Sequence, residues 1–300
     1  MRAAPARGRG PRRLSPPARA DLHAHTRASD GDLTPAELVR RAADLGVATL
    51  AVTDHDTLDG LPEALAAGAA LGVRVIPGIE ISVAVPHGMF HLLGYLPGPS
   101  PEPLASRLAG LREHRALRME RILGRLAELG APVSMADVAR HTDGTVGRPH
   151  VAAALVAAGH ASSREDAFAR FLADDGPAFV PHRGIGPHEA VRLVRESGGA
   201  PVLAHPGTLR LGARHLQSTV QSLRDAGLVG IEVHRPEHTP EQRDAYAAIA
   251  RRLRLVPCGG SDFHGPGQRF ELGDTGVPPL PPDTPDLVFR AVGEGVPSPG

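Results

Sequence analysis

Short apolar runs alternate with amphipathic stretches along most of the chain. Runs with β character are expected at residues 20–25, 48–55, 73–82, 89–95, 200–207, 229–233 and 253–264. Stretches with helical periodicity separate most of these runs, and they carry capping signals such as Thr34 with Glu37 and Thr239 with Gln242. This alternation of strands and helices is typical of an α/β fold.

The alternation is interrupted once, by a long region with only helical periodicity. It begins with an amphipathic stretch that reaches residue 130 and continues with shorter helical segments around Met135, Val151 and Ala167. We therefore expect an all-helical insertion inside the α/β unit. The predicted organisation is a disordered tail (1–19), an α/β unit in two parts (20–99 and 179–272), the insertion (100–178) and a C-terminal segment (273–300).

Composition narrows the classes of function. The 300 residues carry 33 basic and 33 acidic side chains, so no overall field draws the chain to DNA or to a membrane surface. Only one cysteine, Cys258, is present, which excludes an internal disulfide and fits a reducing cytoplasm. The sequence has no run of about twenty apolar residues. We expect a cytoplasmic protein that binds neither DNA stably nor membranes.

Histidines and carboxylates gather at the ends of the expected strands. In the stretch DLHAHTRASDG, His23 and His25 are two residues apart, so they face the same way if the stretch is a strand. The carboxyl ends of later strands carry His55, Glu80, His205, Asp262 and His264. In a parallel α/β barrel these ends form one rim, where distant residues become neighbours. Imidazole and carboxylate ligands together predict a metal centre there.

Several short motifs resemble those of one known family. The stretches DLHAHT with SDG, TDHD, GIE, HLLGY, AHPG and SDFH occur in the order of the polymerase and histidinol phosphatase (PHP) superfamily of metallophosphoesterases. The resemblance covers roughly residues 20–272. It implies an α/β fold in the form of a distorted barrel of about seven βα units, (β/α)7 and TIM-like. The insertion containing GRPHVA resembles the branch that acts on nucleoside 3',5'-bisphosphates and RNA 5' ends.

The resemblance also implies a cluster of two or three divalent metal ions, with manganese expected ahead of iron or zinc. By resemblance, the first ion is bound by His23, His25, Glu80 and Asp262. Glu80 also bridges to a second ion, which His91 and His205 bind. The third ion is bound by Asp30, His55 and His264. The residues expected to take part directly in catalysis are Asp30, His55, Glu80, His205 and His264.

Some of these residues also have a structural interpretation. His91 lies on an apolar strand and could be a core histidine. Asp30 lies in the stretch SDGD, whose residues are also common in tight turns, so it could cap a turn instead. Asp54 and Asp56 flank His55 and could orient its ring, but helix capping is an equal alternative for Asp56.

Substrate contacts are expected on the insertion. Arg148 and His150 lie in GRPHVA, where an arginine can grip a phosphate that is not cleaved. A solvated surface arginine is the alternative. Weaker candidates near the expected strand ends are His182, Glu232, His234 and His238. The remaining histidines are interpreted as surface residues: His87, His114, His141, His160, His188 and His215.

These observations together predict a metal-dependent phosphoesterase that hydrolyses nucleoside 3',5'-bisphosphates or short oligonucleotides. A 5'-3' exoribonuclease on RNA 5' ends is the close alternative. A histidinol phosphatase is less favoured, because the insertion and its arginine suit a second phosphate better than an amine. A metal-binding module without turnover is the contrasting class. The low aromatic content, 3%, gives few stacking platforms for long single strands, which favours small substrates.

Overall fold

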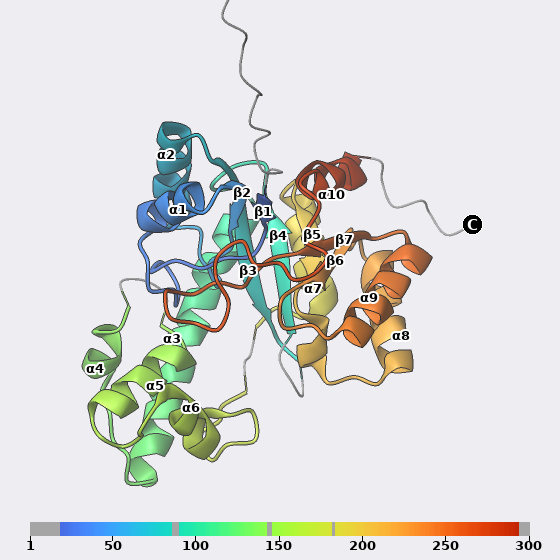
Figure 1. Ribbon diagram of the computed structural model, residues 1–300. Helices are drawn as coiled ribbons and strands as arrows, with labels where there is room; N and C mark the ends of the chain where they lie inside the picture. The colour runs from blue at the N-terminus through green and yellow to red at the C-terminus, as the bar shows by residue number, and fades with distance from the viewer. Residues whose placement is uncertain (1–18, 86–89, 143–145, 182–183, 294–300) are drawn as a thin grey trace, which may run out of the picture.

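The computed structural model describes residues 19–85, 90–142, 146–181 and 184–293. Residues 1–18 of the predicted N-terminal tail lie outside these residues, as do His87, His182 and the side chain of His114, whereas Arg19, the last residue predicted for the tail, begins the first strand. Within the described chain, seven strands form one sheet in chain order (Figure 1). They are β1 (Arg19–Asp21), β2 (Val47–Val52), β3 (Arg74–Val83), β4 (Phe90–Tyr95), β5 (Ala200–Leu203), β6 (Gly230–His234) and β7 (Val256–Gly259).

The sheet is mixed rather than all-parallel. β4 runs antiparallel to both β3 and β5, whereas the other neighbouring strands pair in parallel. The expectation of an all-parallel sheet is therefore wrong at one strand. The physical reason lies in the connection, because only residues 84–89 separate β3 from β4. A parallel pair needs a crossover of a dozen or more residues, so a connection this short returns the chain antiparallel.

The two edges of the sheet approach each other without forming a strand ladder. No described residues of β1 and β7 pair as strands, so a closed barrel is not observed. Backbone hydrogen bonds instead join the segments that follow them: the His25 amide donates to Phe263 at 2.9 Å, and the Asp262 amide donates to His23 at 2.9 Å. These bonds bring the first and last strands of the α/β unit to one place.

Helices cover the sheet on its outer side. They are α1 (Pro35–Asp44), α2 (Leu61–Leu71), α7 (Pro187–Glu196), α8 (Ala213–Asp225) and α9 (Pro240–Leu253). The capping boxes at Thr34 and Thr239 form as predicted. α10 (Thr284–Gly293) packs near β5 and β7, where Val288 joins buried Val202 and Cys258 in a core on the other face of the sheet.

The predicted helical region contains α3 (Leu104–Glu128), α4 (Met135–Ala139), α5 (Arg148–Ala157), α6 (Arg164–Ala167) and the π-helix η1 (Phe168–Leu172). It packs around its own buried cluster, which includes Ile122, Leu155 and Leu172. The first turns of α3 belong to the main core instead, through Leu104 and Leu108. One helix thus ties the helical group to the sheet (Figure 1).

Gly260 allows the chain after β7 to pass close to the chain after β1. A Cβ atom on Gly260 would collide with the Cβ and the backbone nitrogen of His23. Those atoms belong to a buried backbone, so they have little freedom to move.

We predict that Gly260→Ala lowers the free energy of unfolding by about 1–3 kcal/mol, the usual cost of overpacking, and reduces metal binding through displacement of His23. Denaturant unfolding and metal analysis of the purified variant measure the two effects. Gly98→Ala is the matched control, because a Cβ there meets open space. Equal stabilities of the two variants would contradict the prediction.

Candidate metal centre

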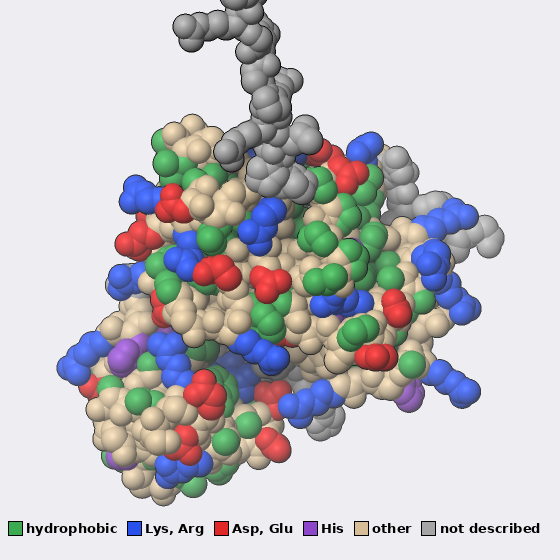
Figure 2. Space-filling model, viewed as in Figure 1, with side chains coloured by type: hydrophobic (Ala, Val, Ile, Leu, Met, Phe, Trp, Pro, Cys, Tyr) green, Lys and Arg blue, Asp and Glu red, His purple; other side chains and the backbone are tan. Residues whose placement is uncertain are grey.

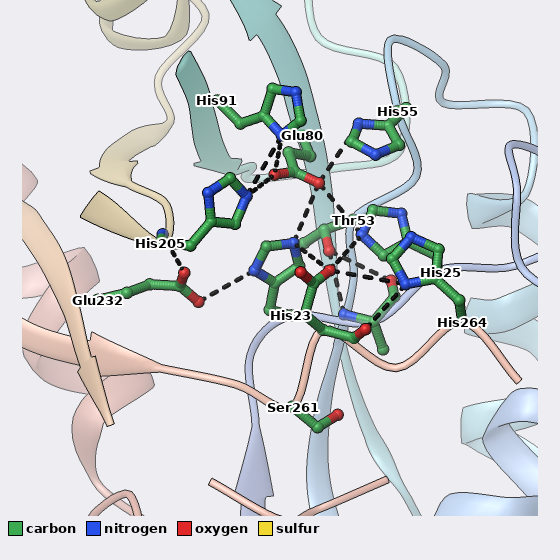
Figure 3. A network of polar contacts seen from close by, with 12 residues as sticks. His23, His25, Thr53, His55, Glu80, His91, His205, Glu232, Ser261 and His264 are labelled. Atoms are coloured by element: carbon green, nitrogen blue, oxygen red, sulfur yellow. Dashed lines mark hydrogen bonds and ion pairs between the residues drawn. The ribbon is translucent and has the colours of Figure 1, made fainter. Parts of the chain in front are cut away.

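The nine predicted ligands lie together at one end of the sheet (Figure 3). His23 and His25 follow β1, although this strand ends at Asp21 and only Ala24 continues it, through an isolated bridge to Phe263. Both imidazoles are nevertheless buried and face the same cluster. His23 and His25 therefore face the same way, as predicted. The regular strand, however, ends earlier than predicted, at Asp21.

Two of the nine residues are not at the carboxyl end of a strand. Glu80 lies inside β3, which continues to Val83, and His91 is the second residue of β4. Because β4 is antiparallel, its amino end lies at the same rim as the carboxyl ends of the parallel strands. His91 sits opposite Ser82 of β3 in this pairing. The antiparallel strand is what brings His91 into the cluster.

The Glu80 carboxylate is at the centre of the cluster. Its Oε2 atom lies 3.1 Å from Nε2 of His23, 3.1 Å from Nε2 of His25 and 3.3 Å from Nδ1 of His55. Its Oε1 atom lies 2.9 Å from Nδ1 of His91 and 2.9 Å from Nε2 of His205. Each oxygen thus faces a different set of imidazoles, which is the arrangement that a bridging carboxylate requires.

In the part of the chain that the structure describes, three groups of side chains could each hold a metal ion, with ligand atoms within 4.8 Å of one another. They are His23, His25, Glu80 and Asp262; then His25, Asp30, His55 and His264; and then His55, Glu80 and His91. The first group is the one expected. His25 and His55 each belong to two groups, whereas the sequence-based assignment gave each residue one ion.

Unpaired buried atoms support a cation at this place. Nδ1 of His25, Oδ1 of Asp30 and Nδ1 of His55 are buried and lack a hydrogen-bond partner among the described residues. Such atoms are costly unless a ligand satisfies them. The mixture of imidazole nitrogens and carboxylate oxygens suits manganese, iron or zinc. The residues therefore fit the divalent ions that the sequence suggests.

Burial and charge shift the pKa values of the cluster in opposite directions. Burial disfavours a charged His23, but the nearby carboxylates of Asp262 and Glu80 outweigh it and raise the pKa of His23 well above its usual range. The same balance raises the pKa of His25 to about 10. Burial dominates at His55 and lowers its pKa to about 4. Without metal, the cluster is thus expected to hold protons on His23 and His25 at neutral pH.

Hydrogen-bond partners outside the cluster of ligand side chains determine which ring nitrogen of a histidine faces the cluster. Glu232, a weaker candidate in the sequence, is fully buried and lies 3.0 Å from Nδ1 of His23. Thr208 lies 3.0 Å from Nδ1 of His205, and the backbone carbonyl of Asp262 lies 2.8 Å from Nδ1 of His264. An acceptor at Nδ1 keeps the proton there and leaves Nε2 as the ligand atom.

The acids on either side of His55 each form hydrogen bonds with a neighbouring segment, and their orienting of the His55 ring stays a prediction. Asp54 accepts hydrogen bonds from the Thr26 amide and the Ser29 hydroxyl, both at 2.7 Å, and so fixes the loop that carries Asp30. Asp56 accepts a bond from the Ser82 amide at 2.7 Å. Neither caps α2, whose N-cap is Gly60.

A pocket of about 430 Å³ connects the cluster with the helical group. Asp30, His55, Glu80, His91, His205, Asp262 and His264 line one side of it, and Arg118, Arg148, Phe168 and Phe179 line the other. Arg148 donates to Oδ1 of Asp174 at 2.8 Å, and its guanidinium carbon lies 5.9 Å and 5.6 Å from the ring centres of Phe168 and Phe179. The predicted phosphate-binding arginine thus lies at the pocket wall.

His150 is placed differently from Arg148. It does not line the pocket, and its Nδ1 accepts a hydrogen bond from the Gly147 amide at 3.0 Å, as a cap of α5. Its contact with substrate remains a prediction. The sequence reasoning missed Arg118, Phe168, Phe179, Thr208, Arg235 and Glu237, which also line the pocket. Thr208, Arg235 and Glu237 had a usable signal, since they follow expected strands.

Comparison with known proteins gives a family. The family model described as PHP domain matches residues 21–132. A 3',5'-nucleoside bisphosphate phosphatase of Chromobacterium violaceum is 35% identical over 271 residues, which cover 87% of this chain and 93% of that protein. The chain belongs to the PHP family. This confirms the resemblance seen in the motifs, and the protein is a metal-dependent phosphoesterase.

Two further PHP relatives agree with this. A 5'-3' exoribonuclease of Escherichia coli is 37% identical over 256 residues, covering 84% of this chain and 87% of that one. A crystal structure from Bifidobacterium adolescentis, titled as a metal-dependent phosphoesterase, has a TM-score of 0.83 at 35% identity and covers 92% of this chain and 98% of that one. None of the helices in the described part of the PHP protein combines the length and apolarity of a membrane span.

Among the described residues of this PHP protein, the histidines that were not predicted as ligands lie outside the three groups that could hold a metal ion. His234 contacts the Pro278 carbonyl, and His238 is buried against the Val233 carbonyl. Three of the histidines interpreted as surface residues are exposed, namely His141, His188 and His215, and His160 is half-buried.

We predict that metal binding to this PHP protein releases protons. Because the pKa of His25 is raised to about 10 in the metal-free protein, a metal must displace its proton at neutral pH. Apparent manganese affinity should therefore rise about tenfold per pH unit for each proton displaced between pH 6 and 8.5. Chelator competition across this range measures the slope, and calorimetry in two buffers counts the protons. A pH-independent affinity would contradict the shifted pKa.

Proposed function

We propose that the protein hydrolyses nucleoside 3',5'-bisphosphates, or short oligonucleotides with equivalent phosphates, in a metal-dependent reaction. One observation carries the proposal: a single pocket has the histidine and carboxylate cluster on one side and two arginines with two phenylalanine rings on the other. A phosphate at the cluster, a second phosphate near Arg118 and Arg148, and a base against Phe168 or Phe179 would fill it. The relative from Chromobacterium violaceum has the corresponding name.

We propose the nine clustered residues as ligands of two or three divalent metal ions, with manganese preferred. His23, His25, Glu80 and Asp262 would hold one ion, and Asp30, His55 and His264 another. Glu80 would join the first to an ion at His91 and His205. Such ions supply positive charge for the phosphate ester and lower the pKa of bound water.

The protein's own groups have definable tasks in this reaction. Glu80 would hold metal ions through both of its oxygens, because these face different imidazoles 2.9–3.3 Å away. Glu232 and Thr208 hold protons at Nδ1 of His23 and His205, so that each ring presents Nε2. The helical group supplies part of the pocket wall, which limits the contact of a bound substrate with water.

The second phosphate is assigned to the arginine side of the pocket. The guanidinium of Arg148 lies near the rings of Phe168 and Phe179, which limits the directions it can take. An oriented guanidinium suits two-point contact with phosphate. His150, at the start of the same helix, would support this region by capping it.

A 5'-3' exoribonuclease is the alternative, as in the relative from Escherichia coli. A terminal nucleotide of RNA would fill the pocket in the same way, and each of the two phenylalanines could stack one base. A histidinol phosphatase fits less well, because the two arginines would face an amine. We also propose that the seven strands form a distorted barrel. Residues 100–178 would be a cap over one end of this barrel.

We predict that the manganese-loaded enzyme prefers a nucleoside 3',5'-bisphosphate to the monophosphate and that Arg148→Ala removes the preference. The loss of kcat/KM for the bisphosphate should be about 30- to 150-fold, which corresponds to about 2–3 kcal/mol for a shielded contact with a charged group. The monophosphate should change little. Steady-state kinetics on both substrates, with 5'-phosphorylated RNA and histidinol phosphate for comparison, measure this.

Arg148→Lys is the matched variant in that experiment, because it keeps the charge and loses the two-point contact. An equal loss on bisphosphate and monophosphate would make Arg148 a stabiliser of the helical group. Faster turnover of the RNA than of the bisphosphate would favour the exoribonuclease instead.

We predict that Glu80→Gln removes more than one equivalent of metal and nearly all turnover, since both oxygens lose their charge at once. The fold should persist, because the apolar side chains of the hydrophobic cores are unchanged and glutamine has nearly the volume of glutamate. Metal analysis and circular dichroism measure both. Glu196→Gln, exposed at the end of α7, is the control. Full metal content in Glu80→Gln would refute the bridging assignment.

A further inference from the structure

A buried arginine lies beside the metal cluster, on the side of the pocket away from the helical group. Arg235 follows β6 in the segment HRPEH and is 1% exposed, yet its side chain lines the pocket. Its Nη2 donates to Oδ2 of Asp262 at 3.0 Å and to Oε2 of Glu237 at 2.9 Å. Its Nη1 donates more weakly to Oε2 of Glu232, at 3.3 Å.

These contacts leave part of the guanidinium unused. Among the residues that the structure describes, Nε of Arg235 is buried and has no hydrogen-bond partner. Nε and Nη2 form one edge of the guanidinium, an edge that binds a carboxylate or phosphate through two parallel bonds. An unpartnered donor on that edge is costly at this depth, so the edge is built for an anion with two oxygens.

The partners of Arg235 differ in how firmly they are held. Glu232 is fully buried and also contacts His23, and Asp262 also contacts His23 and His25. Glu237 instead has a side chain that is 59% exposed, and it forms an ion pair with Arg235 at the surface of the pocket. It lies on the connection between β6 and α9, at the pocket wall. Glu237 is therefore the partner that can leave.

We propose that Arg235 is a ligand of the reacting phosphate and that Glu237 is an internal anion that occupies Arg235 until the phosphate displaces it. The proposal rests on the proposed function, because it assumes that the phosphate to be cleaved lies at the cluster. Arg235 contacts Asp262 of the cluster, so a phosphate there is within its reach. Exchange of one anion for another keeps the buried guanidinium compensated throughout.

The test is a double-mutant cycle with inorganic phosphate as the probe, on manganese-loaded protein in about 0.3 M salt, which screens long-range charge effects. Glu237→Gln should tighten phosphate binding by roughly 3- to 10-fold, because a half-exposed ion pair no longer competes. In the Arg235→Gln background the same change should alter binding by no more than about 1.5-fold. Calorimetry measures binding directly, and phosphate inhibition of turnover measures it a second time.

Controls separate displacement from general effects. Glu241→Gln removes an exposed charge nearby on α9, outside the pocket, and should leave phosphate affinity unchanged. Melting curves and metal content show whether Arg235→Gln is folded and loaded, and Arg235→Lys replaces it in the cycle if it is not. In that background the gain should again disappear, because an ammonium lacks the two-donor edge.

Two results would overturn the proposal. Phosphate affinity that is unchanged in Glu237→Gln would mean that Glu237 does not compete for Arg235. A gain that persists at full size without the arginine would mean that Glu237 only repels phosphate through space. Because phosphate binding needs no choice of substrate, failure to hydrolyse bisphosphates would refute the proposed function without deciding this one.

Discussion

The burial of one carboxylate among five imidazole rings is the constraint on which the rest of the structure depends. Glu80 is fully buried, and its two oxygens have ring nitrogens from five histidines within 3.3 Å. A buried charge is tolerated only when it is fully compensated, by protons on the rings or by metal ions between them. Protons on His23 and His25 compensate the carboxylates in the metal-free protein. Metal ions would replace these protons and supply the chemistry of the centre.

The fold satisfies this constraint by bringing distant segments to one rim. Antiparallel β4 presents His91 at its amino end, and Gly260 after β7 allows the Asp262 segment to lie against His23. Buried Asp21 secures the same region, since it accepts hydrogen bonds from the Ser261 amide at 2.9 Å and the Gly273 amide at 2.7 Å. Close backbone approach is thus as important to the centre as the ligands themselves.

The helical group completes the pocket without sharing the main core. α3 packs its first turns against the sheet and its later turns within the helical group, so it fixes the arginine side of the pocket relative to the cluster. Neither side alone would distinguish a bisphosphate from a simple phosphate ester. The charged side chains on the face seen in Figure 2 are scattered rather than gathered in one patch, which agrees with substrate recognition inside a pocket.

The sequence by itself determined the α/β alternation and the helical character of the region between β4 and β5, because periodicity is a local property of the chain. Through the resemblance of its motifs to those of the PHP family, the sequence also indicated the nine residues of the cluster. It did not determine that β4 is antiparallel, that Glu80 lies inside a strand, or that Asp54 fixes the loop of Asp30. It also gave no reason to expect Arg118 or Phe168 at the pocket. Those features follow from contacts between segments far apart in sequence, where strand direction, burial and pairing are decided together by tertiary packing.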